Sequence, residues 1–220
     1  MSALAVMLAA VGLADLVRRW KVVVGLVVVV AGLLALGAGW HTLWLAILLG
    51  LVVVVWVEAA RHDSSAGLAL LSLATLGLVL ASGELRFHDP ALQGWYDNLA
   101  IPRLDAVPLD RAALGVGVAL FLASAANVAV RRVLQTVGPR VLAQGDELRG
   151  GRVLGPLERW FVFACAVSGN LPAVAVVVAA KGILRFPEIS RDGPHGLRAE
   201  YVLVGSFVSW ALALVLVPLF

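Results

Sequence analysis

Long, uninterrupted apolar runs recur along the whole sequence, and their length limits the possible folds more than any other feature. Runs of ~17–25 residues can cross the ~30 Å hydrocarbon core of a bilayer as α-helices. Backbone polar groups in lipid must be satisfied within the segment, so continuous runs predict helices, whereas a barrel would show short alternating segments. Of the 220 residues, 61% are hydrophobic and 14% charged, while soluble domains carry about 25% charged residues. The sequence therefore predicts an integral membrane protein whose main partner is the lipid bilayer.

The recurrence of these runs predicts an all-α fold, a polytopic transmembrane helical bundle of about seven spans in one integral membrane domain, residues 1–220. The first run carries no charge before Asp15 and no basic segment in front of it. We therefore expect a retained helix there and not a signal peptide. The expected spans cover residues 2–17, 21–38, 41–58, 66–82, 112–130, 156–183 and 201–219.

The distribution of Lys and Arg between the connections predicts the orientation of the chain. With these spans, ten of the 17 basic residues fall on one side of the membrane and seven on the other. The side with ten includes Arg18, Arg19 and Lys21, which lie close to two span ends, and basic residues there resist translocation. We therefore expect a protein of the cytoplasmic membrane with its N-terminus outside and its C-terminus cytoplasmic.

Two connections are longer than a tight turn. Residues 83–111 are expected to form an outer loop with a short interfacial helix that begins at Asp89-Pro90, a typical N-cap pair. Trp95 in this loop suits the headgroup level, where amphipathic rings concentrate. Residues 131–152 are expected to form a cytoplasmic basic segment. This segment is either a solvated linker or a contact to anionic lipid.

Charged residues occupy both ends of the expected sixth span. Glu158 and Arg159 stand at its cytoplasmic end, and Lys181 stands 23 residues after Glu158. In one continuous helix this separation corresponds to ~35 Å. We therefore expect a cytoplasmic-end charged pair, Glu158 and Arg159, and a second group of charges at the opposite headgroup layer. The two groups would not contact each other.

The outer group contains two cations on one helix face. Lys181 and Arg185 are four residues apart, and like charges at that spacing repel each other. A negative partner is therefore expected, either a carboxylate of the chain or a bound phosphate or carboxylate, which Arg recognises well. Alternatively, these charges only complement helix ends and hold the last two spans together. The candidate residues for an anion or headgroup site are Lys181, Arg185, Glu188, Glu200 and Tyr201.

Few polar residues are expected at mid-depth. Asn170 would lie ~18 Å above Glu158 along the helix, with a kink at Pro172. Ser209 in the last span would reach a similar depth and could hydrogen-bond to Asn170. No ionisable residue is expected at the bilayer centre, where proton relays usually place one, which argues against a proton-coupled transporter.

Three linked motifs in residues 150–212 resemble a known signature. The segments "GRVLGPLER", "AAKGILRF" and "AEYVLVGSFVS" resemble the pattern G-x-x-I-G-x-L-E-R, A-A-K-S-x-x-R-F and E-Y-x-x-I-G-T-x-x-S. This pattern marks the C-terminal part of a family of uncharacterised bacterial polytopic membrane proteins, a domain of unknown function. The departures are Leu154, Gly182, Val204 and Ser206. The resemblance implies a bacterial cytoplasmic (plasma) membrane and a charged-ended helical hairpin, and it implies no activity.

The remaining chemistry-bearing residues do not form a recognisable catalytic or metal motif. Cys165 has no second cysteine to pair with, and the four histidines show no metal-ligand spacing. We expect no catalytic residue, no cofactor, no metal and no nucleic-acid partner. The first function hypothesis is binding of an anionic headgroup or small solute in a transport-related role. The alternatives are a structural or accessory subunit of a membrane complex, as a homo-oligomer or with a membrane-protein partner, and a membrane enzyme that acts on a phosphorylated lipid.

Overall fold

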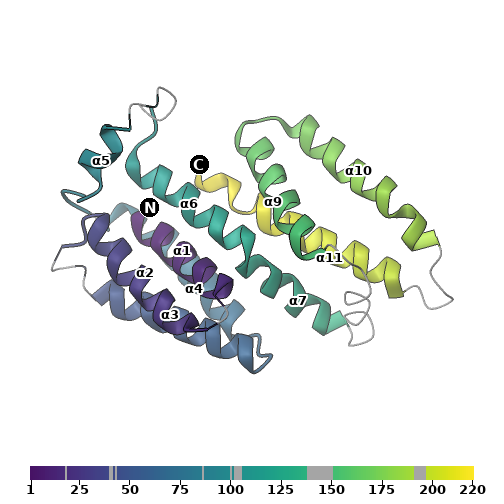
Figure 1. Ribbon diagram of the computed structural model, residues 1–220, viewed down its shortest axis with the longest axis horizontal. Coiled ribbons are helices and arrows are strands. Elements are labelled where there is room, and N and C mark those ends of the chain that lie inside the picture. Colours follow the sequence, from purple (N-terminus) through teal and green to yellow (C-terminus); the bar gives the residue numbers. More distant parts are fainter. Residues whose placement is uncertain are drawn as a thin grey trace. The chain divides into compact units, whose positions relative to one another are not determined.

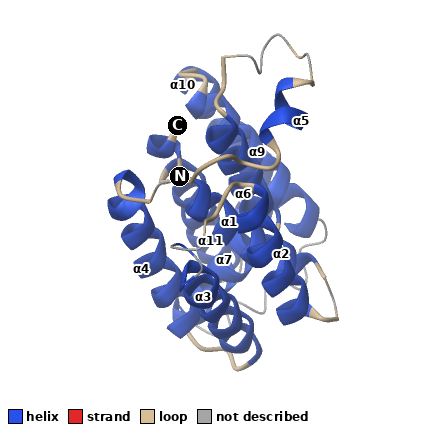
Figure 2. Ribbon diagram, turned by 90° about the vertical axis from the view of Figure 1, so that its left-hand side faces the viewer, coloured by secondary structure: helices blue, strands red, loops and turns tan. Residues whose placement is uncertain are grey.

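In the computed structural model, the described part of the chain is built of helices joined by loops and contains no strand (Figure 2). The all-α fold predicted from the apolar runs is therefore confirmed. The described residues are 1–17, 19–39, 42, 44–85, 87–99, 101, 106–137, 151–190 and 197–220, with the backbone alone at 151–153, 188–189 and 197–198.

The helices fall into two compact units, residues 1–121 and 122–220 (Figure 1). We expected a single domain, and each unit is described by itself. Unit 1 holds α1 (Ser2–Leu16), α2 (Lys21–Ala35), α3 (Trp44–Arg61), α4 (Ala66–Leu80), α5 (Gln93–Asp97) and most of α6 (Leu109–Ala123). Unit 2 holds the end of α6 and then α7 (Ala125–Val137), α9 (Gly151–Val167), α10 (Leu171–Ser190) and α11 (Leu197–Leu214). Short 3-10 turns follow α4, at Ala81–Gly83, and α11, at Val217–Leu219.

In unit 1, α1 is the central helix. Its apolar residues lie all around its circumference, and nearly all of them are buried, which is typical of a helix surrounded by other helices. Small residues let the neighbours approach closely. A Cβ added to Gly117 of α6 would stand 2.4 Å from the carbonyl oxygen of Ala5, and one added to Gly12 would stand 2.6 Å from the backbone of Leu120. Glycines at helix crossings have this function in membrane bundles.

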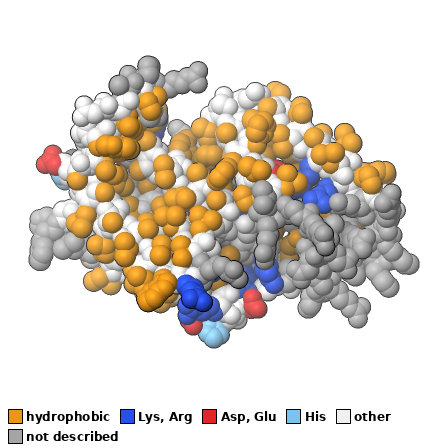
Figure 3. All heavy atoms as spheres, viewed as in Figure 1, with side chains coloured by type: hydrophobic (Ala, Val, Ile, Leu, Met, Phe, Trp, Pro, Cys, Tyr) orange, Lys and Arg blue, Asp and Glu red, His pale blue; other side chains and the backbone are white. Residues whose placement is uncertain are grey.

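The outer faces of the helices are apolar. Large hydrophobic side chains such as Ile47, Leu73, Val176 and Ile183 are exposed, and hydrophobic atoms cover much of the face in Figure 3. Soluble proteins rarely expose contiguous apolar patches of more than a few hundred Å². Within the described residues, three helices are long and apolar enough to cross a membrane, or four if the bent pair α6–α7 counts as one span. These properties indicate a membrane protein.

The expected sixth span is two helices, which corrects the expectation of one kinked helix over 156–183. The chain turns back between α9 and α10 because Gly169 adopts φ +75°, the left-handed conformation that ends helices. The amide of Asn170 donates to the carbonyl of Cys165 at 2.8 Å, and its own Oδ1 accepts from the amide of Ala173 at 3.2 Å. Asn170 therefore closes one helix and caps the next.

The two long connections differ in part from expectation. The loop 83–111 contains a helix, but α5 begins at Gln93, because Asp89 has a left-handed φ of 47°. Trp95 is exposed, and the Tyr96 hydroxyl donates to the carbonyl of Val107 at 2.9 Å. In the expected basic segment 131–152, residues 131–137 complete α7 and 151–152 begin α9, whereas 138–150 lie outside the described residues.

Candidate functional site

Three helices of unit 2 meet at the carboxylate of Glu158. Its Oε2 pairs with Lys181 Nζ of α10 at 2.5 Å, and its Oε1 accepts from Trp210 Nε1 of α11 at 2.6 Å. The Lys181 ammonium also lies 5.4 Å from the centre of the Trp210 ring, within the range of a cation–π interaction. Glu158 and Lys181 were expected at opposite headgroup layers, and that expectation is wrong. The turn at Gly169 brings them together.

Arg159 is buried beside this pair and binds only uncharged acceptors. Its Nε donates to the carbonyl of Leu122 at 2.8 Å, Nη2 to Asn127 Oδ1 at 2.6 Å, and Nη1 to Ser209 Oγ at 3.1 Å. Only 2% of Arg159 is exposed. Leu122 and Asn127 flank the break between α6 and α7, and the C-terminal carbonyls of a helix carry partial negative charge. The end of α6 thus supplies part of the counter-charge that a burial of this kind requires.

We call Glu158, Arg159, Lys181, Asn127, Ser209 and Trp210 the charged cluster. Its depth follows from the helices that it joins. Ser209 lies ten residues from each end of the apolar stretch Ala199–Leu219, or ~15 Å from each end. If that stretch crosses a bilayer, the charged cluster lies near mid-depth and not at the headgroups. The expectation that no ionisable residue reaches that depth does not hold for this geometry.

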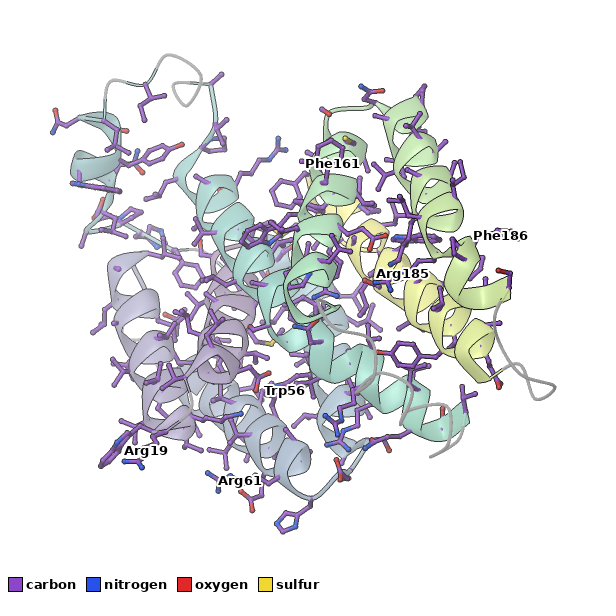
Figure 4. All side chains as sticks on the ribbon, turned by 45° about the vertical axis from the view of Figure 1, so that its right-hand side comes forward. Arg19, Trp56, Arg61, Phe161, Arg185 and Phe186 are labelled. Carbon is purple, nitrogen blue, oxygen red and sulfur yellow. The ribbon has the colours of Figure 1, made fainter. Side chains whose placement is uncertain are left out.

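The other residues predicted for the anion site are not all gathered at the charged cluster. Arg185 lies one turn beyond Lys181 and points toward α9 and α11, whereas Phe186 points away from them (Figure 4). Glu200 is exposed, and Tyr201 is partly exposed at the start of α11. The side chain of Glu188 lies outside the described residues. Lys181 and Arg185 therefore lie on one face of α10. The partner of Lys181 is Glu158, which was expected from the sequence at the opposite headgroup layer.

The polar residues expected to meet at mid-depth are separated. Asn170 lies in the exposed turn between α9 and α10, so it does not bond to Ser209. Ser209 accepts from Arg159 instead. Trp210 and Asn127 were not predicted for the site, because tryptophan in an apolar run indicates packing or an interface position. A weak signal for Trp210 was its position next to Ser209 in the sequence, whereas Asn127 was expected near the cytoplasmic end of the span 112–130.

Unit 1 contains a similar arrangement near the end of α1. Trp56 Nε1 of α3 donates to Asp15 Oδ2 at 2.8 Å, and Lys21 Nζ of α2 lies 3.6 Å from Asp15 Oδ1. As at Glu158, a carboxylate on one helix is bound by a lysine on the next helix and by a tryptophan on a third. Asp15 is the next-to-last residue of α1, so this group lies at a helix end. It therefore offers matched controls for Lys181 and Trp210.

A cavity of about 320 Å³ lies in unit 1, lined in part by Ser2, Ser82, Gln93 and Asp110. Its charged side chain is a carboxylate, which does not suit an anion. Within the described residues, no group of three or more His, Cys, Asp or Glu side chains could hold a metal ion. The cationic groups of unit 2 are thus the part of the described chain that best suits an anionic ligand.

Comparisons with known proteins gave no match, since no family model, no curated protein and no solved structure corresponds to the chain. The resemblance of residues 150–212 to a bacterial membrane-protein family therefore stays a prediction. The function has to be inferred from the geometry of the charged cluster.

Proposed function

We propose that this chain is a polytopic protein of a bacterial cytoplasmic membrane that binds an anion at Lys181 and Arg185 in a transport-related role. The shared chemistry of the ligand is a phosphate or carboxylate group, carried by a lipid headgroup or by a small solute. About seven spans and an outside N-terminus were expected from the sequence, and α1 and α2 are counted among the spans because both are apolar.

The observation that carries the proposal is the excess of positive charge in the charged cluster. Two cations, Arg159 and Lys181, lie beside one carboxylate, Glu158, among apolar helices. The acceptors of Arg159 are all uncharged. Charged side chains inside membranes are costly, and they commonly mark the path of a substrate or an ion. A bound anion would balance the excess charge.

The Lys181 ammonium is more accessible to a ligand than the Glu158 carboxylate. The side chain of Lys181 is 20% exposed and that of Glu158 only 8% exposed. The ammonium has three donors, and the contact with Glu158 uses one of them. Arg185 follows on the same face and offers a planar fork that suits phosphate and carboxylate. A ligand that reaches Lys181 from the exposed side would therefore meet the ammonium before the Glu158 carboxylate.

The proposal is tested by native mass spectrometry of the protein in lipid nanodiscs. One arm uses phosphatidylcholine with a minor fraction of phosphatidylglycerol, and the other uses phosphatidylcholine with added inorganic phosphate. We expect a retained anion in wild type, at least tenfold less in Lys181→Gln and in Arg185→Gln, and full retention in the control Lys21→Gln. The arm that shows retention identifies a headgroup or a free anion as the ligand. Equal retention in all variants would overturn the proposal.

A structural or accessory role is the second candidate, because one specific observation favours it. Both oxygens of Glu158 are bonded, and these bonds join α9, α10 and α11. A clamp of this kind predicts that Lys181→Gln lowers the thermal midpoint without any change in bound anion. A protein that copurifies with wild type and is lost with Lys181→Gln would identify the partner of such a subunit.

A further inference from the structure

We propose that α9 and α10 each cross the membrane, so that the chain crosses it eight times and Phe220 lies on the same side as Met1. The crossings are α1, α2, α3, α4, the bent pair α6–α7, α9, α10 and α11. The sequence predicted one crossing over residues 156–183 and therefore opposite sides for the two ends. This topology does not depend on anion binding at Lys181.

The contacts of the charged cluster fix the level of the hairpin against α11. Glu158 and Arg159 bond to Trp210 and Ser209, in the middle of the apolar stretch Ala199–Leu219. From Glu158 to Ser168 the helix rises ~15 Å, which matches the distance from Ser209 to the end of that stretch. The ring centres of Phe163 and Phe220 lie 5.4 Å apart, so the C-terminal end of this stretch packs against α9 on the turn side of Glu158. The turn therefore lies at the level of the C-terminal end of the stretch Ala199–Leu219 and not at its middle.

The contacts with the bent pair α6–α7 place the charged cluster at the same depth, independently of α11. Arg159 bonds to Leu122 and Asn127, which lie near the centre of the pair Leu109–Val137. A hairpin that entered only half of the bilayer would have its turn at this level. Instead, the observed hairpin has its charged residues there and its turn ~15 Å beyond them.

The turn itself suits a membrane surface. Its residues are exposed, and Ser168 and Asn170 are polar. The amides of Ser168, Gly169, Asn170 and Leu171 all donate to nearby carbonyls, and Pro172 has no amide hydrogen. The turn therefore brings no unsatisfied backbone donor into the membrane or its interface, as a crossing hairpin requires.

The distribution of basic residues supports this topology more strongly than it supports seven spans. With eight crossings, only Arg86, Arg103 and Arg111 of the 17 basic residues fall on the outer side. Arg159, Lys181 and Arg185 lie within the hairpin, and the other eleven fall on the cytoplasmic side. The seven-span arrangement gave ten against seven. A bias of eleven to three is the larger asymmetry expected for a cytoplasmic face.

Three of the charges within the hairpin have partners within unit 2, which makes the crossing feasible. Lys181 pairs with Glu158, and Arg159 binds the end of α6 and two polar side chains. Intramembrane charges are tolerated where they face the bundle interior and find such partners.

The topology is tested by cysteine accessibility in intact and permeabilised cells, on the full chain with Cys165→Ala. A membrane-impermeant maleimide is applied to single-cysteine variants Glu84→Cys, Ser168→Cys and Phe220→Cys, and to Ser64→Cys and Ser190→Cys. We expect labelling of the first three in intact cells and of the last two only after permeabilisation.

Two other results would overturn the proposal. If Phe220→Cys is labelled from the side opposite to Glu84→Cys, the hairpin does not return the chain. If Ser168→Cys resists labelling from the outer side while Phe220→Cys is labelled there, the hairpin enters the bilayer without crossing it. A folding defect in any one variant is recognised by its loss from the membrane fraction, and Ser82→Cys or Leu171→Cys, at the exposed Leu171, then replaces the affected outer position.

Discussion

Glu158 and Arg159 are neighbours in the sequence, but they serve different sets of helices. Glu158 faces α10 and α11 through Lys181 and Trp210, while Arg159 faces the break between α6 and α7. Adjacent residues on a helix point in different directions, so one short segment can bind two groups of neighbours. Removal of one partner of a buried charge leaves the other uncompensated, which commonly costs about 3–5 kcal/mol. Both residues are therefore expected to be needed for the folded unit 2.

Trp210→Phe tests the hydrogen bond to Glu158 at little cost in packing. The substitution removes the indole N–H that donates to Oε1 at 2.6 Å and keeps an aromatic ring beside Lys181. We expect a loss of about 1–3 kcal/mol in the free energy of unfolding, because the acceptor is charged and buried. The measurement is chemical unfolding in mixed micelles. Trp44→Phe is the control, since Trp44 is exposed at the start of α3, and an equal effect of the two substitutions would contradict the role of Trp210.

At the residue scale, the sequence predicted which charged residues belong to the candidate site, but it did not predict which of them contact each other. Glu158, Arg159, Lys181 and Arg185 were all singled out by their position in an apolar run. Their pairing depended on the conformation of Gly169, and a glycine in an apolar run does not by itself show a left-handed turn. Ser209 was predicted at mid-depth with Asn170 as a possible partner, and it is buried with Arg159 as its partner instead.

At the scale of the elements, the stretch "SGNLP" at residues 168–172 decides the fold of unit 2. Proline within an apolar run favours a kink, and that was the interpretation from the sequence. The same residues also match a helix end followed by a helix start, with Gly after the first helix, Asn as N-cap and Pro in the first turn. The structure follows the second pattern, because the bonds of Asn170 satisfy both helix ends at once.

Gly169→Ala tests this turn. A Cβ at φ +75° costs about 1–2 kcal/mol, because the left-handed region is strained for residues other than glycine. No atom lies within 4 Å of the added Cβ, so the effect would be conformational and not a clash. Gly182→Ala is the control in the interior of α10, where it also meets no atom within 4 Å and helix propensity favours Ala.

We expect Gly169→Ala to lower the thermal midpoint in nanodiscs and Gly182→Ala to leave it unchanged or raise it. A continuous helix over 156–183 predicts that both substitutions stabilise the protein. The two variants therefore separate a hairpin from a kinked span without any assumption about function.

The other helices were predicted well, because continuous apolar runs specify them directly. The expected spans at 2–17, 21–38, 41–58 and 66–82 correspond to α1–α4, with differences of a few residues at their ends. The span 112–130 corresponds to the bent pair α6–α7, whose 44° break was not expected. Ser124 lies at that break, and neither a proline nor a glycine in the sequence indicates it.

At the scale of the whole chain, the hairpin α9–α10 adds one crossing to the topology that we propose and brings charged residues of two helices together. Each unit contains a carboxylate bound by a lysine and a tryptophan from two other helices, Asp15 in unit 1 and Glu158 in unit 2. The group at Asp15 lies at a helix end, and the Asp15 side chain is only 5% exposed. The group at Glu158 lies at the level of the middle of the apolar stretch Ala199–Leu219, where its charges must be balanced within the protein or by a ligand.

The most direct test of the pairing at the centre of unit 2 is a double-mutant cycle on unfolding free energy in mixed micelles. The cycle uses Glu158→Gln, Lys181→Gln and the double variant. It is compared with Glu58→Gln, Arg61→Gln and their double variant at an exposed pair whose atoms lie 3.1 Å apart. We predict a coupling of about 1–3 kcal/mol for the buried pair and less than about 1 kcal/mol for the exposed pair. Additive effects of Glu158→Gln and Lys181→Gln would contradict the hairpin, because they are the result expected for two residues ~35 Å apart on one continuous helix.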